Sequence, residues 1–453
     1  MSLEKFFSPS SIAVIGASRE PGKLGNVILE NIKYSFKERI YPINPYTTEI
    51  LGLKTYSSVL EIEEPIDLAI IVVPAEIVEN VVKECIKKKI KAAVIISSGF
   101  SEIGEKEREL AIKKLCKSKK IRIIGPNCIG VYKKGLDMLF FPKNRIKRPP
   151  EGSISFLTQS GAFGSILLDI LAHNGVGVSK FISFGNKVDV DEIDLFKYLE
   201  DDLTTRCIAF YLESVTDGKE FIKAAKNVTK KKPVVVFKAG KTKEGTEAVA
   251  SHTGSMAGSA EVYSAAFKQA GIIEAKDSEE LFDFAKALAK QPVLKDNKIA
   301  IVTDGGGFGI AATDAAIECG LELPPLSTES VKALKKFLPP YAITNNPIDL
   351  TGDADAERYE KALKIVLNDK NISGVVCIAL LQIPTLDDEI IDVLRDSKMF
   401  GKPITVCSAG GNYVLERNKR LEKVGIPVFP SPERAVKAML VLYEYGNILK
   451  RKN

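Results

Sequence analysis

The stretch IAVIGASREPGKLGNVILENI, residues 12–32, reads as a strand, a glycine-rich turn and a helix. Gly16, Gly22 and Gly25 are spaced G-x5-G-x2-G, which gives a longer loop than the G-x-G-x-x-G turn of dinucleotide-binding domains. Such a loop can direct backbone N–H groups at a phosphate, with Lys23 adding positive charge. By itself the pattern leaves two interpretations open, a nucleotide-like ligand or a turn that only requires glycine.

Short apolar runs of strand type alternate with helical stretches along the whole chain. Runs that are apolar on both faces predict parallel strands covered by helices, so the class is α/β. The pattern restarts after a basic, proline-rich segment at residues 141–152 and again after a polar segment at 290–298. Both segments are typical of linkers. We therefore expect three α/β domains, at residues 1–140, 150–290 and 297–453.

Composition and charge restrict the class of protein. The 453 residues are 45% hydrophobic and 27% charged, with a formal net charge of +6. The lysines are spread over helical faces, which favours a solvated surface over nucleic-acid binding. No apolar run reaches the roughly 18 residues of a membrane helix, and the start of the chain lacks a signal-peptide pattern. The seven cysteines show no metal-ligand spacing, so we expect a cytoplasmic protein without a metal site of its own.

Two further glycine-rich turns follow predicted strands, TQSGAFG at residues 158–164 and DGGGFG at 304–309. Neither ends in the G-K-[ST] of a nucleotide-hydrolysing P-loop. A helix N-terminus at either turn would present N–H groups and partial positive charge to a phosphate, although glycine there can also serve only to permit a positive φ. The candidate phosphate-binding residues are Gln159, Ser160, Gly161, Ala162, Gly305, Gly306 and Gly307.

His252, one of only two histidines, lies in the small-residue segment SHTGSMAG. An imidazole is a good nucleophile near neutral pH, and the surrounding glycines and serines leave it room to move. A nucleophilic histidine needs a carboxylate on its second nitrogen. Glu213, at the end of the predicted strand CIAFYLE, is the candidate, with an ordinary strand-end charge as the alternative.

Three other features have plainer interpretations. His173 precedes an Asn-Gly that is typical of a helix end, so we expect a structural role. Cys128 is interpreted as a small buried hydrophobe, or alternatively as a residue that lines a ligand site. The acidic stretch 183–196 lacks the glycine and closing glutamate of a calcium loop, so we expect a loop that leads into a helix.

Taken in order, these motifs, together with YPINPY, SSGFSE, IGPNCIGV and NNPIDLTGDA, resemble the α subunits of the ADP-forming acetyl-CoA synthetases of the succinyl-CoA synthetase superfamily. The resemblance implies a Rossmann-like CoA-binding domain followed by two flavodoxin-like, succinyl-CoA-synthetase-type domains. It also implies phosphorylation of His252, support from Glu213, and stabilisation of the phosphohistidine by the two glycine-rich helix N-termini. The implied CoA-binding residues are Gly16, Ser18, Lys23, Gly25, Asn44, Pro74, Ser97, Ser98, Gly99 and Asn127.

The same resemblance implies a reaction and a partner. Acetyl-CoA, phosphate and ADP would give acetate, CoA and ATP through acetyl phosphate and a phosphorylated histidine. The family binds ADP and Mg²⁺ in an ATP-grasp module, for which the last residues, GNILKRKN, leave no room. We therefore expect a separate ATP-grasp β subunit in an α2β2 assembly. The alternatives are a CoA sensor or scaffold of the same fold and an NAD oxidoreductase, although no acid follows the first loop at the spacing that holds a ribose.

Overall fold

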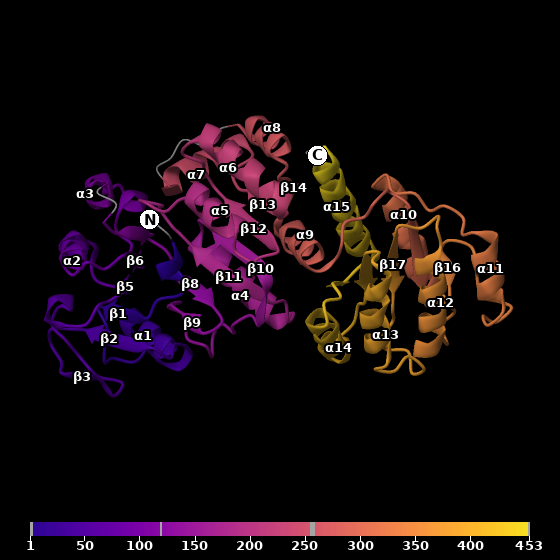
Figure 1. The fold of residues 1–453 in the computed structure, drawn as a ribbon, viewed down its shortest axis with the longest axis horizontal. Coiled ribbons are helices and arrows are strands. Elements are labelled where there is room, and N and C mark those ends of the chain that lie inside the picture. Colours follow the sequence, from indigo (N-terminus) through magenta and orange to yellow (C-terminus); the bar gives the residue numbers. More distant parts are fainter. Residues whose placement is uncertain (1–2, 118–119, 254–258, 452–453) are drawn as a thin grey trace. The chain divides into compact units, whose positions relative to one another are not determined.

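The computed structural model describes residues 3–117, 120–253 and 259–451, apart from the side chains of residues 250–253. The chain forms two compact units. The N-terminal unit comprises Met1–His173 and Gly177–Lys276, and the C-terminal unit comprises Asn174–Val176 and Asp277–Asn453. Parallel sheets with helices packed against them make up both units, as the α/β prediction requires (Figure 1).

The first sheet of the N-terminal unit carries the glycine-rich turn at residues 16–25. Its five parallel strands lie in the order β2 (Arg39–Ile43), β1 (Ser11–Ile15), β5 (Leu68–Ile71), β6 (Ala92–Ile95) and β7 (Arg122–Ile124). The connecting helices are α1 (Leu24–Ser35), α2 (Ala75–Lys87) and α3 (Lys106–Cys116), and β3 (Glu49–Ile50) and β4 (Leu53–Lys54) form a small hairpin. All of β1 is buried, and the strand order reverses between β1 and β5, the position where open α/β sheets bind ligands.

The second sheet of this unit contains seven strands. Their order is β14 (Ile273–Ala275), β13 (Val234–Lys238), β12 (Cys207–Leu212), β10 (Glu151–Thr158), β11 (Val178–Ser183), β8 (Val131–Lys133) and β9 (Leu136–Asp137). Among the described residues of this sheet, β8 pairs antiparallel with both β11 and β9, and the other pairings are parallel. The helices are α4 (Gly161–His173), α5 (Glu192–Glu200), α6 (Gly218–Lys231), α7 (Lys243–Thr253) and α8 (Ala260–Ala270).

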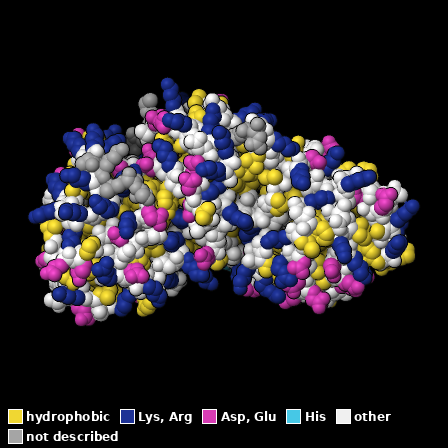
Figure 2. All heavy atoms as spheres, viewed as in Figure 1, with side chains coloured by type: hydrophobic (Ala, Val, Ile, Leu, Met, Phe, Trp, Pro, Cys, Tyr) yellow, Lys and Arg dark blue, Asp and Glu magenta, His cyan; other side chains and the backbone are white. Residues whose placement is uncertain are grey.

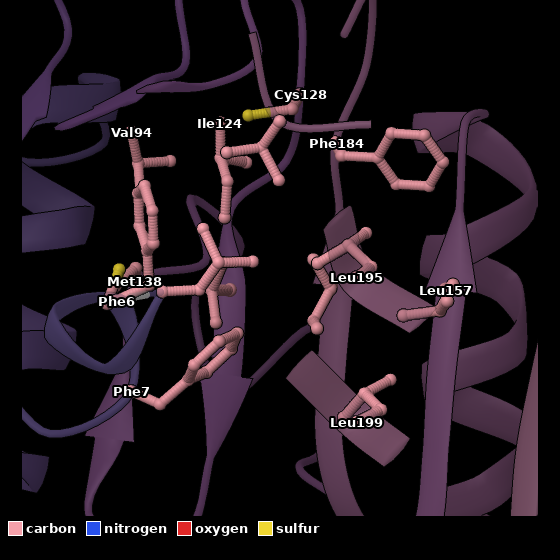
Figure 3. Packing of buried hydrophobic residues seen from close by; sticks show 14 of the residues in the cluster. Phe6, Phe7, Val94, Ile124, Cys128, Met138, Leu157, Phe184, Leu195 and Leu199 are labelled. Carbon is pink, nitrogen blue, oxygen red and sulfur yellow. The ribbon is translucent and has the colours of Figure 1, made fainter. Parts of the chain in front are cut away.

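One hydrophobic core joins the two sheets of the N-terminal unit. Figure 3 shows Val94 of β6 and Ile124 of β7 in the same cluster as Leu157 of β10. Near the chain start, the ring of Phe7 stacks on that of Tyr198, with centroids 4.8 Å apart. The two sheets therefore share buried apolar surface and belong to one packed body.

The acidic stretch 183–196 adds an ionic link between these sheets. Arg122 of β7 pairs with Asp189 at 2.8 Å and with Asp194 at 2.6 Å. Asp191 caps α5 by accepting hydrogen bonds from the backbone N–H groups of Ile193 and Asp194. The stretch is thus a loop that leads into a helix, as predicted. The sequence analysis did not anticipate that Asp189 and Asp194 would pair with Arg122.

The C-terminal unit contains the third parallel sheet. Its strand order is β16 (Ile348–Asp349), β15 (Ile299–Thr303), β17 (Gly374–Ile378), β18 (Ile404–Cys407) and β19 (Val428–Phe429). Its helices are α9 (Ser278–Lys290), α10 (Gly306–Glu318), α11 (Thr328–Lys335), α12 (Ala356–Asn368), α13 (Ile390–Asp396), α14 (Asn412–Lys423) and α15 (Pro432–Lys450). Buried ion pairs hold α9 in this unit, Lys286 with Glu422 at 3.3 Å and Asp283 with Arg434 at 2.6 Å.

The packing differs in two places from the expected domain limits. Strands β8 and β9 precede residue 140 but pair with the second sheet, and α9 precedes residue 290 but packs in the C-terminal unit. Numbered along the chain, the parallel strands of each sheet follow the order 2-1-3-4-5 of flavodoxin. On the face drawn in Figure 2, basic and acidic side chains of the described residues are interspersed, in keeping with a solvated surface.

Candidate active site

A pocket of about 880 Å³ in the N-terminal unit brings most of the predicted CoA and phosphate residues together. Its volume falls within the range of roughly 300–1,000 Å³ that is common for small-molecule sites. The predicted residues that line it are Gly16, Ser18, Lys23, Gly25, Pro74, Ser97, Ser98, Asn127, Gln159, Ser160, Gly161 and Ala162. The pocket therefore runs from the N-terminus of α1 to the N-terminus of α4.

The loop before α1 requires glycine on steric grounds. A methyl group at Gly16 would lie 2.2 Å from the carbonyl oxygen of Val72, and one at Gly25 would lie 2.0 Å from that of Gly16. Lys23 is the N-cap of α1, and no side chain caps the helix. The first N–H groups of α1 thus remain available to an anion, so the same loop satisfies both interpretations left open by the sequence.

The loop before α4 is held by its own side chains. The Thr158 hydroxyl donates to the carbonyl oxygen of Ser160 at 2.7 Å, and the Ser160 hydroxyl accepts from the N–H of Phe163 at 3.3 Å. Ser160 is therefore an N-cap that satisfies one helix donor. The N–H groups of Gly161 and Ala162 precede that capped donor and belong to residues that line the pocket.

Gln159 connects this loop to Glu213. Its side-chain oxygen accepts hydrogen bonds from the backbone N–H groups of Glu213 and of Ser214, the latter at 3.1 Å. Glu213 is only 6% exposed, and the charge of its carboxylate acts on the Tyr211 hydroxyl. Burial, together with that carboxylate, raises the pKa of Tyr211 to about 12. A buried acid consequently lies directly beside the phosphate loop.

The side chain of His252 lies outside the described residues. The backbone of residues 243–253 forms α7, which follows β13 after a short turn. The predicted nucleophile thus belongs to the connection after β13, the strand that pairs with β12, and its role remains a prediction.

Two predicted CoA residues, Asn44 and Gly99, are not among the residues that line the pocket. The Asn44 amide donates to the carbonyl oxygen of Ala17 at 2.7 Å, which braces the loop before α1. The N–H of Gly99 donates to the Glu102 carboxylate at 2.6 Å. Both groups shape strand-end loops through protein contacts.

Cys128 fits both of its interpretations. It is buried, its thiol donates to the carbonyl oxygen of Ile95, and it also lines the pocket. Burial raises its pKa to about 12, so the thiol stays protonated and unreactive near neutral pH. His173 is the last residue of α4 and is exposed, as expected for a residue at a helix end.

The sequence analysis missed the apolar wall of the pocket. This wall comprises Leu24, Val72, Val73, Ile96, Ile129, Phe140 and Phe141. The two phenylalanine rings pack with centroids 4.5 Å apart. The only signal was the adjacent aromatic pair just before the first linker, and nothing in the local sequence assigned it to a pocket.

The glycine-rich turn at residues 304–309 belongs to the C-terminal unit and lies at the start of α10. Gly305 is the N-cap and receives no side-chain cap, and the Thr303 hydroxyl donates to its carbonyl oxygen at 2.9 Å. Asp304 is buried and accepts from the N–H of Leu380 at 3.0 Å. Burial raises the pKa of Asp304 to about 6, and the charge of Asp349 adds to the shift. This turn is therefore more acidic than the turn before α4.

Comparisons with known proteins give this geometry a family. The chain matches a CoA binding domain over residues 10–134, a succinyl-CoA ligase like flavodoxin domain over 151–288 and a Ligase-CoA domain over 299–448. It is 42% identical to the acetate–CoA ligase [ADP-forming] I subunit alpha of Pyrococcus furiosus, with 98% of each chain covered. The chain belongs to the family of ADP-forming acetate–CoA ligases.

Two other proteins similar to this chain extend the comparison. Acetate–CoA ligase [ADP-forming] I of Archaeoglobus fulgidus is 43% identical over 98% of this chain, which spans 64% of that longer protein. The structure of the dinucleotide-forming acetyl-coenzyme A synthetase 1 of Ca. Korarchaeum cryptofilum, in complex with phosphate and ADP, is 37% identical. It covers 100% of this chain and 99% of its own, with a TM-score of 0.92, and the predicted fold is thereby confirmed.

No described helix is long and apolar enough to span a membrane. No group of three or more His, Cys, Asp or Glu side chains within the described ranges is arranged to hold a metal ion.

Proposed function

We propose that this chain is the α subunit of an ADP-forming acyl-CoA synthetase that converts acetyl-CoA, phosphate and ADP to acetate, CoA and ATP. The observation that carries the proposal is the single pocket that extends from the helix N-terminus at α1 to that at α4. One N-terminus suits the diphosphate of CoA and the other suits inorganic phosphate. A thioester and its phosphate nucleophile would then share one cavity.

The first step is an acyl transfer. A phosphate oxygen bonds to the thioester carbonyl carbon, the C–S bond breaks, and CoA leaves as the thiolate. The N–H groups of Gly161 and Ala162 and the dipole of α4 would bind the phosphate and fix its direction of attack. The Phe140 and Phe141 wall would exclude water from the thioester, so that phosphate and not water takes the acyl group.

The second step moves the phosphoryl group to the protein. A nitrogen of His252 bonds to phosphorus, the bond from phosphorus to the acetyl oxygen breaks, and acetate leaves. Glu213 would accept the hydrogen bond from the second imidazole nitrogen, which fixes the tautomer and stabilises the charge on the ring. The N-terminus of α10, with Gly305, Gly306 and Gly307, is the second proposed support for the phosphohistidine.

The last step needs a partner. We propose an ATP-grasp β subunit in an α2β2 assembly, where Mg²⁺ and ADP bind and the phosphoryl group is transferred to form ATP. The name of the Pyrococcus furiosus relative, a subunit alpha, supports a partner chain. In this proposal the predicted domains 1–140, 150–290 and 297–453 bind CoA, carry the phosphohistidine and supply the second helix N-terminus.

A labelling experiment tests the proposal without the partner. The full chain is incubated with acetyl-CoA and radioactive phosphate, and protein-bound, acid-labile phosphate is measured. We expect label on the wild type and none on His252→Ala, while CoA raises the melting temperature of both proteins equally. A wild type that binds CoA but takes up no phosphate would instead identify a CoA-binding sensor or scaffold.

A further inference from the structure

Lys238 is a buried lysine beside the proposed phosphoryl-transfer site. It is the last residue of β13 and pairs in register with Leu212, the residue before Glu213. Its side chain is only 2% exposed. The ammonium donates to the carbonyl oxygen of Ala239 and lies 4.6 Å from the centre of the Tyr263 ring. Burying a lysine without a role is costly, so its position needs an explanation.

Three charged groups and one aromatic ring surround Lys238. Glu213 follows β12 and attracts the ammonium, whereas Lys241, beyond β13, repels it. Lys241 is itself paired with Glu274 of β14 at 2.9 Å. Tyr263 of α8 supplies the aromatic face.

One further ion pair includes an acid whose charge acts on Tyr263. Lys187 pairs with Glu192 of α5 at 3.1 Å, and the charge of Glu192 also acts on Tyr263. This carboxylate already has its own lysine, so Glu213 is the acid whose charge acts on Lys238.

The proposed chemistry brings a charge problem to this place. A phosphoryl group on an imidazole is a dianion, and the carboxylate that orients the imidazole is a third negative charge in a partly buried site. Gln159 contributes only dipoles here, since its side-chain oxygen accepts from the backbone N–H groups of Glu213 and Ser214. The ammonium of Lys187, which is paired with Glu192, donates to the Ser214 carbonyl oxygen at 2.6 Å. A nearby cation would reduce the repulsion between carboxylate and phosphoryl group.

We propose that Lys238 is a positioning residue whose ammonium offsets the Glu213 carboxylate, so that the imidazole held by Glu213 can accept a doubly negative phosphoryl group. This inference rests on the proposed function. Lys238 touches neither CoA nor phosphate in this scheme and acts through Glu213.

The inference has a consequence for pH. Burial lowers the pKa of Lys238 to about 8, despite the opposing charge of Glu213. The ammonium is present below that pH and is lost above it. Phosphorylation of His252 should therefore slow as the pH rises through about 8. An arginine at this position keeps its charge far beyond that range.

The first test compares phosphate uptake from acetyl-CoA and phosphate in three full-length variants. Lys238→Met keeps the apolar stem but removes the charge, and we expect roughly 10-fold slower labelling, the scale of coupling between neighbouring charged groups. Lys238→Arg should retain most of the wild-type rate. Lys180→Met is the matched control, because Lys180 is also buried, on β11, but pairs with Asp202 at 2.6 Å. It should lower the melting temperature and leave the labelling rate unchanged.

Two further measurements separate a charge effect from a folding defect. In a Glu213→Gln background, Lys238→Met should cost less than about 2-fold, because a residue that acts through Glu213 loses its effect when that carboxylate is gone. In the pH profile, the loss of rate near pH 8 should move to higher pH in Lys238→Arg, even if Lys238→Met does not fold.

The outcomes are distinguishable. A wild type that takes up no phosphate overturns the proposed function, and this inference with it. A labelled wild type whose rate is matched by a folded Lys238→Met overturns the inference alone. If the labelling rate falls at the same alkaline pH in the wild type and in Lys238→Arg, the inference is likewise overturned and the proposed function is not.

Discussion

The turns before α4 and α10 are two versions of one local structure, TQSGAFG at 158–164 and TDGGGFG at 303–309. In each, a threonine hydroxyl donates to the carbonyl oxygen two residues later, at 2.7 Å and 2.9 Å. In each, the last glycine lies beneath that threonine, where a methyl group would approach its Cγ2 to 2.8 Å or 3.0 Å. The shared threonine and glycines therefore encode the turn, and the residues that differ encode its electrostatics.

The second position of the motif shows the difference. Gln159 and Asp304 each accept hydrogen bonds from backbone N–H groups just beyond the neighbouring strand. Glu213 and Leu380 occupy equivalent positions there, two residues after the strand residue that pairs with the threonine. The N-terminal unit thus combines a neutral turn with an acidic neighbour, and the C-terminal unit combines an acidic turn with an apolar neighbour. Only the first arrangement places a carboxylate for an imidazole beside a helix N-terminus whose own turn carries no charge.

Glu213→Leu copies the C-terminal arrangement and should have the largest effect. We expect phosphorylation of His252 to fall roughly 100- to 1,000-fold, the range for loss of an acid–base partner. Phosphate uptake measures the rate, and the CoA-induced rise in melting temperature, which should be unchanged, shows that the pocket is intact. Glu213→Gln keeps the shape of the side chain, so its phosphorylation rate should lie between those of the wild type and Glu213→Leu. Equal rates in all three proteins would show that the acid at this position has no part in the reaction.

Adding a methyl group under each threonine compares the two turns as structures. At Gly164 a methyl group would lie 2.8 Å from both the Phe181 ring and Thr158, whereas at Gly309 it would meet only Thr303, at 3.0 Å. We expect Gly164→Ala to destabilise its unit by about 2–3 kcal/mol and Gly309→Ala by about 1 kcal/mol, within the range for overpacking. Calorimetric unfolding of each variant measures the difference. If Gly309→Ala destabilised its unit more than Gly164→Ala, the distances to the added methyl group would not determine the cost of overpacking at these turns.

The acidic turn should be a source of pH-dependent stability. The pKa of Asp304 is raised to about 6 in the folded chain, compared with about 3.9 when unfolded. Its stabilising contribution is complete below pH ~4 and is lost as the pH rises through about 6. Asp304→Asn should therefore stabilise the C-terminal unit by roughly 2 kcal/mol at pH 7 and by almost nothing at pH 4. Urea unfolding at both pH values measures this, and a variant that is less stable at pH 7 would contradict it.

The sequence predicted the fold well because its signals are local. Apolar runs such as SIAVI, glycines such as Gly16 and the Asp191 cap each act over a few residues. The site was only partly predictable, because adjacency in a 2-1-3-4-5 sheet is not adjacency in sequence. The contact of Gln159 with Glu213 exists because β10 pairs with β12.

The features that the sequence analysis missed also depend on contacts between residues that are distant in sequence. Phe140 and Phe141 follow strands that join the second sheet through the antiparallel pairing of β8 with β11. Asn44 has a side chain typical of a ligand contact, but its amide is taken up by Ala17. Lys238 appears in the sequence as an ordinary strand-end charge, and only its burial and its ring contact set it apart. Pairing between distant strands and competition for hydrogen bonds are tertiary effects, which a local pattern does not contain.

Gln159→Glu makes the N-terminal turn acidic, like its counterpart, with almost no change in shape. The new side chain can still accept from the N–H groups of Glu213 and Ser214, but it loses the amide that donates to the Ser214 carbonyl oxygen. When ionised, it adds a negative charge beside Glu213 and at the phosphate-binding helix end, so labelling at pH 7.5 should fall roughly 10-fold. Lowering the pH protonates the carboxyl and restores the donor, so the ratio of variant to wild-type rate should rise toward one near pH 5.5. A steric defect would give a ratio that does not change with pH. If Gln159→Glu were labelled at the wild-type rate at pH 7.5, the neutrality of the turn, which is the main contrast between the two units, would not affect the reaction.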